Sequence, residues 1–168
     1  MSRAIKDPEL LETMKELAYM HIQKETKTLA DILKIVADAT DIDVSNGVVN
    51  TQMRLSSADL EAICLRIPAE CAFLQAAMTN FNIKLMFSEL EIEDKVTTHL
   101  ASMKGGNAVE RMRIAEQQEY KAMVINAVNK TVAKGIQGYI ERADKTYEAI
   151  KKVLDYRSKE GWFDRKGV

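Results

Sequence analysis

Residues 107–160 decide the fold, and they read NAVERMRIAEQQEYKAMVINAVNKTVAKGIQGYIERADKTYEAIKKVLDYRSKE. This stretch contains no proline, and its apolar residues recur at steps of three or four: Val124, Val128, Val132, Ile136, Ile140, Ala143, Tyr147, Ile150 and Leu154. Such spacing places them on one face of an α-helix. At about 1.5 Å per residue the helix would extend for tens of ångströms, so its apolar face needs packing partners along its whole length.

A second amphipathic run, residues 57–103, precedes this stretch and provides a partner for it. Ser56 or Ser57 is the predicted helix cap, and Asp59 stands in the first turn. Its apolar residues alternate steps of three and four, as in a seam between helices: Leu60, Cys64, Ile67, Cys71, Leu74, Met78, Phe81 and Leu85. Pro68 predicts a kink, because proline removes one helical hydrogen bond.

Gly105-Gly106 separates the two runs, and glycine pairs terminate helices, while Asn107 can cap the next one. A short loop between two long amphipathic helices predicts an antiparallel helical hairpin. Gly135 and Gly138 lie inside the second helix, at a cost of about 1 kcal/mol each relative to alanine. They indicate either the close approach of a neighbouring backbone or a flexible joint.

Residues 1–50 are expected to form an N-terminal amphipathic helical segment and a linker. Asp7-Pro8 begins a helix over 8–39, and the wholly polar interval 24–28 predicts a break or bend, which leaves one helix or a helical pair open. Residues 41–50 are rich in Asp, Ser, Asn and Gly and are interpreted as a linker, before a short extended segment.

The linker begins like a calcium-binding loop, but its twelfth position is Gln52 rather than a bidentate glutamate, which argues against calcium. At the other end, residues 161–168 are interpreted as an aromatic and basic tail in which helix is not expected to persist.

The composition favours an all-α protein. The 168 residues are 46% apolar but only 6% aromatic, with two prolines, a mixture suited to helices packed by aliphatic side chains. Neither a signal-peptide core nor an uncharged apolar run of the ~20 residues that span a bilayer occurs. Cys64 and Cys71 are too far apart along one helix to form a disulfide, and reduced thiols are typical of cytoplasmic proteins. We therefore expect a cytoplasmic protein that does not enter a membrane.

Catalytic motifs are missing from the sequence. His21 and His99 have no metal-ligand spacing around them, and neither a nucleophile elbow nor a phosphate-binding loop occurs. The carboxylates of residues 89–94 stand on a charged helix surface rather than in an apolar pocket that would tune their pKa values. We expect no enzymatic activity, no cofactor and no metal.

Binding is the remaining class of function. The formal net charge is only −1, but it sums to −3 over residues 1–50, −2 over 51–104 and +4 over 105–168. Five cations gather in sequence about the glycine turn and are candidates for contacts with phosphates: Lys95, Lys104, Arg111, Arg113 and Lys121. The tail supplies a candidate surface for base stacking or for a protein partner: Trp162, Phe163, Arg165 and Lys166.

From residue 53 onward, the order of several short stretches resembles a known family. These stretches are Met53-Arg54-Leu55-Ser56-Ser57, Ile83-Lys84, Glu89-Leu90-Glu91-Ile92-Glu93, Ala115-Glu116 and Ala149-Ile150-Lys151-Lys152-Val153-Leu154-Asp155-Tyr156-Arg157. Over roughly two-thirds of its length the chain is similar to phage recombination mediators of the UvsY type. In residues 95–101 it departs from that family, because only Lys95 is charged and the family's Lys-x-Arg pair is absent.

The resemblance implies a non-enzymatic protein of the bacterial host cytoplasm that forms ring-like homo-oligomers. It implies binding to single-stranded DNA and partnership with a phage recombinase and a single-strand binding protein. Two long helices carry more apolar surface than one hairpin covers, which also predicts a homo-oligomer. The expected seam comprises Leu74, Met78, Phe81, Leu85, Ile136, Ile140, Tyr147, Ile150 and Leu154. The alternative is a helical structural or adaptor protein, either a virion component or a protein inhibitor, that binds only proteins.

Overall fold

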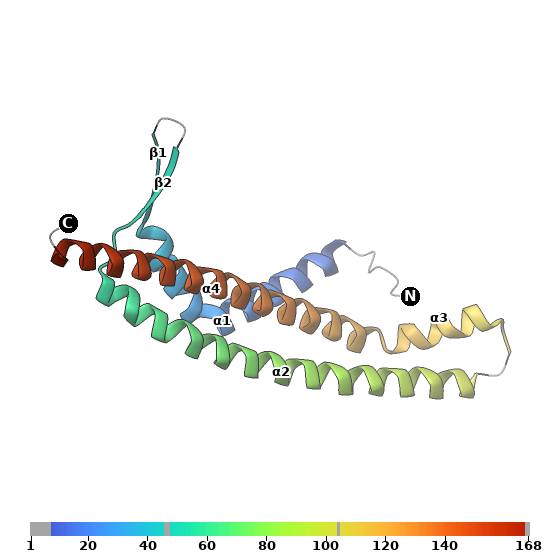
Figure 1. Cartoon of the computed structure of the whole chain (residues 1–168). Helices are drawn as coiled ribbons and strands as arrows, with labels where there is room; N and C mark the ends of the chain where they lie inside the picture. The colour runs from blue at the N-terminus through green and yellow to red at the C-terminus, as the bar shows by residue number, and fades with distance from the viewer. Residues whose placement is uncertain (1–7, 46–47, 104, 167–168) are drawn as a thin grey trace. The chain divides into compact units, whose positions relative to one another are not determined.

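The structure is a computed structural model that describes residues 8–45, 48–103 and 105–166, without the side chains of residues 8, 41–45, 48–52, 118 and 161–166. Six elements follow one another along the chain (Figure 1): α1 (Pro8–Asp38), β1 (Thr40–Ser45), β2 (Val48–Met53), α2 (Ser57–Ser102), α3 (Ala108–Gln118) and α4 (Tyr120–Lys166). Four helices therefore make up the framework of the described chain, which confirms the all-α prediction in its coarse form.

The chain divides into two compact units, each built from stretches that are distant in sequence. The first unit combines Met1–Lys24 with Ala76–Ile136, and the second combines Glu25–Gln75 with Gln137–Val168. Helices α1, α2 and α4 each contribute to both units.

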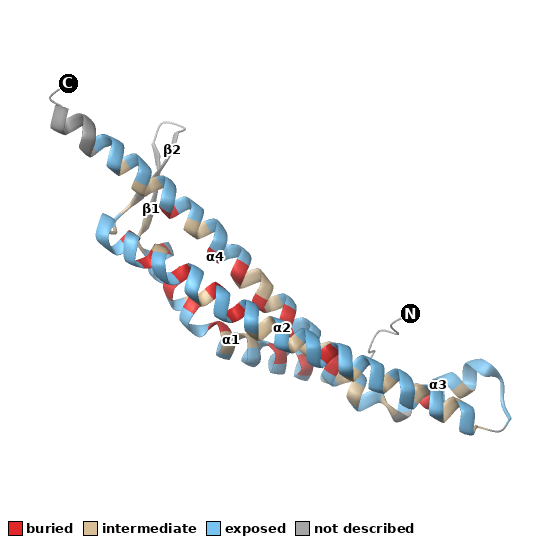
Figure 2. Cartoon of the chain, turned by 60° about the horizontal axis from the view of Figure 1, so that its bottom comes forward, coloured by how far each residue is buried: buried red, intermediate tan, exposed pale blue. Residues whose placement is uncertain are grey.

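Each unit has its own apolar core, and buried residues recur along its helices at helical spacing (Figure 2). In the first unit the buried apolar residues are Met14, Ala18, Leu85, Ala115, Val132, Ala133 and Ile136. In the second they are Leu29, Ile32, Val36, Leu60, Ile63, Ile67, Cys71, Leu74, Ile140, Ala143 and Ile150. The three-to-four spacing of the sequence therefore marks the side of each helix that is buried within the chain.

The ends of α2 and the start of α3 follow the predicted capping chemistry. Ser56 caps α2, since the Asp59 backbone N–H donates to Ser56 Oγ at 3.2 Å and the Ser56 N–H donates to Asp59 Oδ2 at 3.3 Å. The backbone N–H of Glu110 donates to Asn107 Oδ1 at 2.8 Å, which confirms Asn107 as the cap of α3. Between the two helices, Gly105 and Gly106 adopt φ values of 91° and 78°, a region that favours glycine.

The interpretation of residues 41–50 as a linker is wrong, because β1 and β2 form an antiparallel pair with Ser45 opposite Val48. The expected short extended segment after residue 48 is present as β2. Two residues of the sequence, Asn46-Gly47, separate the strands, and Asn-Gly between two extended runs is typical of tight β-hairpins. The Asn-Gly pair is therefore the local signal for this hairpin, whereas the polar composition of the stretch favours a linker.

Three predicted helix boundaries also need correction. Helix α1 continues through residues 24–28, where a break was expected, and Thr26 is buried there. The single helix expected over 107–160 is interrupted at Glu119, whose φ and ψ of −95° and 10° are not helical. Helix α4 then continues to Lys166, so the backbone of most of the predicted tail is helical. No proline or glycine at Glu119 signals this interruption in the sequence. The side chain of Glu119 instead lies 3.4 Å from Nε2 of His99, a contact between stretches that are distant in sequence.

The two glycines inside α4 differ in their surroundings. A Cβ built at Gly135 would overlap the side chain of Ile22 on α1, whereas a Cβ at Gly138 meets no atom within 4 Å. The close approach predicted at the first position is therefore present, although the neighbour is a side chain rather than a backbone. Gly135 is a packing residue of the first unit.

Arg157 connects two distant parts of the second unit. Its Nη1 donates to the Leu55 carbonyl and its Nη2 to the Met53 carbonyl, both at 2.7 Å. One guanidinium fork thus ties α4 to the segment that links β2 to α2.

Candidate functional site

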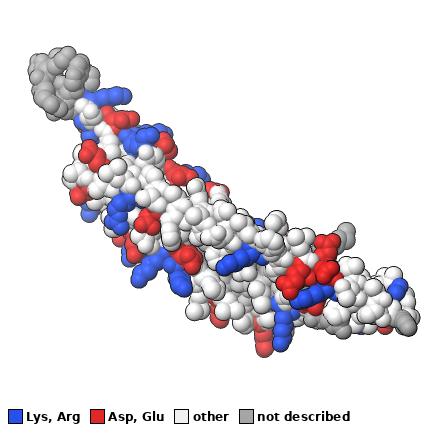
Figure 3. All heavy atoms as spheres, turned by 90° about the horizontal axis from the view of Figure 1, so that it is seen from below, with Lys and Arg blue, Asp and Glu red and all other residues white. Residues whose placement is uncertain are grey.

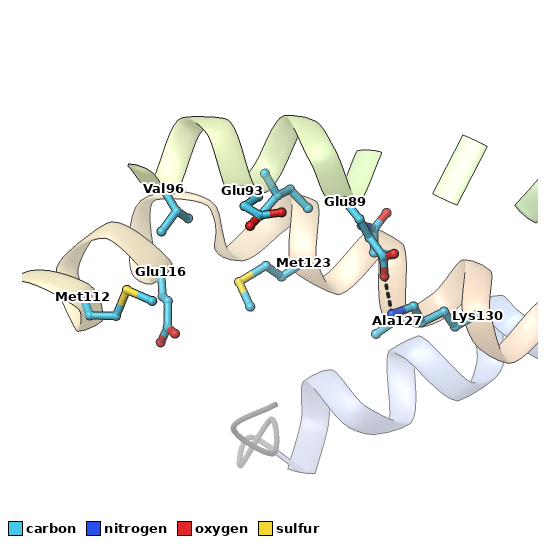
Figure 4. Close-up of a pocket in the computed structure, with 10 residues that line it drawn as sticks. Glu89, Glu93, Val96, Met112, Glu116, Met123, Ala127 and Lys130 are labelled. Atoms are coloured by element: carbon cyan, nitrogen blue, oxygen red, sulfur yellow. Dashed lines mark ion pairs between the residues drawn. The ribbon is translucent and has the colours of Figure 1, made fainter. Parts of the chain in front are cut away.

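A cavity of about 370 Å³ lies in the first unit between α2, α3 and α4 (Figure 4). It is lined by Glu89, Ile92, Glu93, Val96, Met112, Glu116, Met123, Asn126, Ala127 and Lys130. Five of these ten side chains are apolar, and four are charged. The cavity is open to solvent, since five of its lining residues are exposed: Glu89, Glu93, Met112, Met123 and Lys130.

The charged side chains of this cavity are not balanced. Lys130 on α4 forms an ion pair with Glu89 on α2, drawn as the dashed line in Figure 4. Glu93 and Glu116 also line the cavity, from α2 and α3, and neither has an ion-pair partner among the residues that the structure describes. The cavity therefore has an excess of two carboxylates.

Asn126 adds an unusual polar group to the same cavity. The residue is only 6% exposed, and its side-chain Oδ1 is buried with no hydrogen-bond partner in the described part of the chain. Buried side-chain acceptors are normally paired, because leaving one without a donor costs about 1–3 kcal/mol. Because Oδ1 itself has almost no accessible surface, it is an unpaired acceptor in the interior rather than a group that the cavity presents to a ligand.

The acidic side chains of residues 89–94 are exposed, which agrees with their interpretation as a charged helix surface. Nothing in the local sequence sets Asn126 apart from other polar residues of a helix. The convergence of the lining residues arises only because α2, α3 and α4 meet in the first unit.

The cations predicted to contact DNA do not form a uniformly positive patch. Lys95 pairs with Glu91 at 2.7 Å, and this hydrogen bond raises the pKa of Lys95 and lowers that of Glu91. From residue 89 to residue 121 the sequence carries five basic and seven acidic residues. On the face drawn in Figure 3, Lys and Arg side chains are interleaved with Asp and Glu.

The other four cations of the predicted cluster differ from one another. Arg113 on α3 and Lys121 on α4 are exposed, with no ion pair in the described ranges. Arg111 is half-buried, and its buried Nε has no hydrogen-bond partner there. Lys104 lies outside the described residues. Arg113 and Lys121 are thus the members most available to a phosphate.

The tail residues offer less for the site. The backbone of residues 162–166 belongs to α4, but the side chains of Trp162, Phe163, Arg165 and Lys166 lie outside the described residues. Their proposed stacking or partner role stays a prediction.

The predicted oligomer seam needs correction, because most of it is buried within one chain. Five of the nine residues are 0–7% exposed, and a second copy cannot reach them without rearrangement: Leu74, Leu85, Ile136, Ile140 and Ile150. The other four, Met78, Phe81, Tyr147 and Leu154, are half-buried.

A different apolar surface is open on α2. We call it the outer stripe: Ile83, Met86, Phe87 and Leu90, which are 46%, 53%, 63% and 56% exposed. Steps of three, one and three place these four residues on one face of the helix. The sequence of α2 therefore contains two apolar faces: the seam predicted from the three-to-four spacing and the outer stripe beside it.

In the described residues, no group of three or more His, Cys, Asp or Glu is placed to hold a metal ion. Among these same residues, no helix is both long and apolar enough to cross a membrane. Comparisons of the chain with protein-family models, with curated proteins and with solved structures found no match.

Proposed function

We propose that this chain is a non-enzymatic recombination mediator that assembles with copies of itself, binds single-stranded DNA and helps to load a recombinase. Its partners would be a phage recombinase and a single-strand binding protein in the bacterial host cytoplasm. The observation that carries the assembly is the outer stripe, since large apolar side chains gathered on one helix face mark a surface that another protein covers.

The proposed protomer is one long antiparallel helical hairpin, with α2 as one arm and α3 with α4 as the other. Contacts inside each unit support this arrangement. In the first unit Glu89 pairs with Lys130 and His99 with Glu119, so the sequence numbers rise on one arm and fall on the other. In the second unit, Arg157 holds the segment just before α2.

DNA binding is assigned to Arg113 and Lys121, the two exposed cations of the cluster without ion-pair partners. Each can attract a phosphate without first breaking an intramolecular ion pair. Lys95 is already paired with Glu91, so it should contribute less. Two phosphate contacts on a single strand give a salt slope of about −1.4, or about sevenfold weaker binding between 50 and 200 mM salt.

Fluorescence anisotropy with a labelled single-stranded oligonucleotide tests this assignment. Arg113→Ala with Lys121→Ala should weaken binding and flatten the salt slope, whereas the matched Lys95→Ala variant should change both less. Binding that is insensitive to salt, or an equal effect of all three substitutions, would contradict the assignment.

Light scattering after gel filtration tests the assembly. Phe87→Glu with Leu90→Glu should lower the mass of the particle, because it places two charges in an apolar contact. Asn82→Glu, an exposed position beside the outer stripe, is the control and should keep the wild-type mass. A wild-type protein that is monomeric at micromolar concentration would refute self-assembly.

The alternative is a structural or adaptor protein that binds only other proteins. Interleaved charges of both signs and the formal net charge of −1 favour it, because they offer nucleic acid little overall attraction. No binding of single-stranded DNA at low salt, together with assembly through the outer stripe, would select this alternative.

A further inference from the structure

We infer that two copies of the chain pair through the outer stripe in antiparallel orientation, about a two-fold axis beside Phe87. The inference rests on the self-assembly proposed above and adds the orientation and register of the second copy, which that proposal leaves open. The surface that carries it lies within the first unit, on the part of α2 from Asn80 to Asp94.

Polar residues limit the outer stripe at both ends. Asn80 precedes Ile83 by three positions, and helical periodicity places it on the same side of α2. Asp94 follows Leu90 by four positions and lies on that side as well. Both polar residues are exposed. The apolar part is therefore short, and a second copy of the stripe is a partner of matching length.

One flank of the stripe carries a charge of each sign. Lys84 and Glu91 are seven residues apart, close to two helical turns, so they lie on the same flank. Lys84 is exposed and has no ion-pair partner among the residues that the structure describes. Glu91 pairs with Lys95 at 2.7 Å through Oε1, and a carboxylate has two oxygens that can accept. Lys84 and Glu91 are therefore both available to a neighbouring chain.

An antiparallel two-fold pair joins these groups. A two-fold axis perpendicular to the helices brings the same flank of each copy together and reverses the order of the residues. Three residue pairs are centred within half a residue of Phe87: Ile83 with Leu90, Lys84 with Glu91, and Asn80 with Asp94. An axis at that residue therefore places apolar side chains against apolar ones, each cation against an anion and each amide against a carboxylate.

A parallel pair fits the same residues poorly. Each residue of the seam would then meet its own counterpart, so the two Asp94 carboxylates would face each other. Lys84 of one copy would not meet Glu91 of the other, because the same flank of each copy lies on opposite sides of a parallel pair. Juxtaposed like charges oppose association, so the charges select the antiparallel orientation.

Charge reversal tests the register, with sedimentation of the full-length chain measured over a range of concentrations. Lys84→Glu and Glu91→Lys should each weaken self-association by about tenfold, because two attractive pairs become repulsive. An equal mixture of the two variants should associate as the wild type does, since each charge then meets the opposite charge on the other variant. Lys121→Glu makes the same change of net charge on α4 and should leave the association unchanged.

Disulfide formation tests the orientation independently, in chains that also carry Cys64→Ala and Cys71→Ala. In the antiparallel pair the two copies of Asn80 are separated along the helices by about 14 residues, or ~20 Å, whereas a disulfide needs Cα atoms about 4–7 Å apart. Asn80→Cys alone should therefore not cross-link, and a mixture of Asn80→Cys with Asp94→Cys should. A parallel pair predicts the reverse.

The outcomes separate this inference from the proposal on which it rests. A wild-type chain that stays monomeric overturns both the self-assembly and this pairing. A wild-type chain that associates overturns the antiparallel pairing alone if Lys84→Glu associates equally well, or if the mixture fails to recover. Cross-linking of Asn80→Cys with itself has the same consequence. Binding of DNA enters none of these measurements.

Discussion

Replacing Arg157 by alanine should lower the stability of the second unit more than replacing any exposed residue of α4. The guanidinium donates two hydrogen bonds of 2.7 Å, to the carbonyls of Met53 and Leu55, across more than 100 residues of sequence. Hydrogen bonds from a charged donor contribute about 1.5–3 kcal/mol each. Because Arg157 is half-buried, water can replace part of this, and we expect a total loss of about 2–4 kcal/mol.

Urea denaturation followed by circular dichroism measures this loss. With a slope of roughly 2 kcal/mol per molar urea, Arg157→Ala should lower the unfolding midpoint by about 1–2 M. Protein concentration must be held constant, because self-assembly would itself raise the apparent stability.

Two further variants show whether the guanidinium fork is responsible. Lys159→Ala removes an exposed cation two residues further along α4 and should change the free energy of unfolding by less than about 0.5 kcal/mol. Arg157→Lys keeps the charge but cannot present two fixed donors, so it should lose about half as much as alanine. The reasoning is refuted if Arg157→Ala matches Lys159→Ala, or if Arg157→Lys matches the wild type.

Other substitutions test the packing of each unit. Gly138→Ala should stabilise the protein by about 1 kcal/mol, because a Cβ there meets no neighbour. Gly135→Ala should destabilise it by about 1–2 kcal/mol, because a Cβ there overlaps the side chain of Ile22. Urea midpoints that shift in the same direction for both variants would contradict this. Asn126→Leu should stabilise by about 1–3 kcal/mol by removing an orphaned acceptor, and a clear loss of stability would show that the amide is satisfied. Burial raises the pKa of the thiols of Cys64 and Cys71, so iodoacetamide should alkylate both slowly at neutral pH. Buried Cys71 should react more slowly than half-buried Cys64, as followed by mass spectrometry. Faster alkylation of Cys71 would be evidence against this packing.

The sequence by itself determined the features that depend on neighbouring residues. Ser56 and Asn107 cap helices because their side-chain oxygens accept backbone N–H groups within the next turn. Gly105-Gly106 ends a helical region because glycine tolerates a positive φ. The three-to-four spacing identified the buried face of α2 and α4, since helical periodicity alone decides which side chains share a face.

Only the tertiary structure decided the features that depend on distant residues. Glu119 interrupts a helical sequence beside His99, and Arg157 joins carbonyls more than 100 positions away. It also decided that five of the nine residues of the predicted oligomer seam are buried within one chain, while the outer stripe on α2 is left open. The cavity at Asn126 arises in the same way, because three helices bring its lining together. Local sequence fixes a helix and its faces, but which residue meets which side chain is set by packing between segments that the sequence keeps far apart.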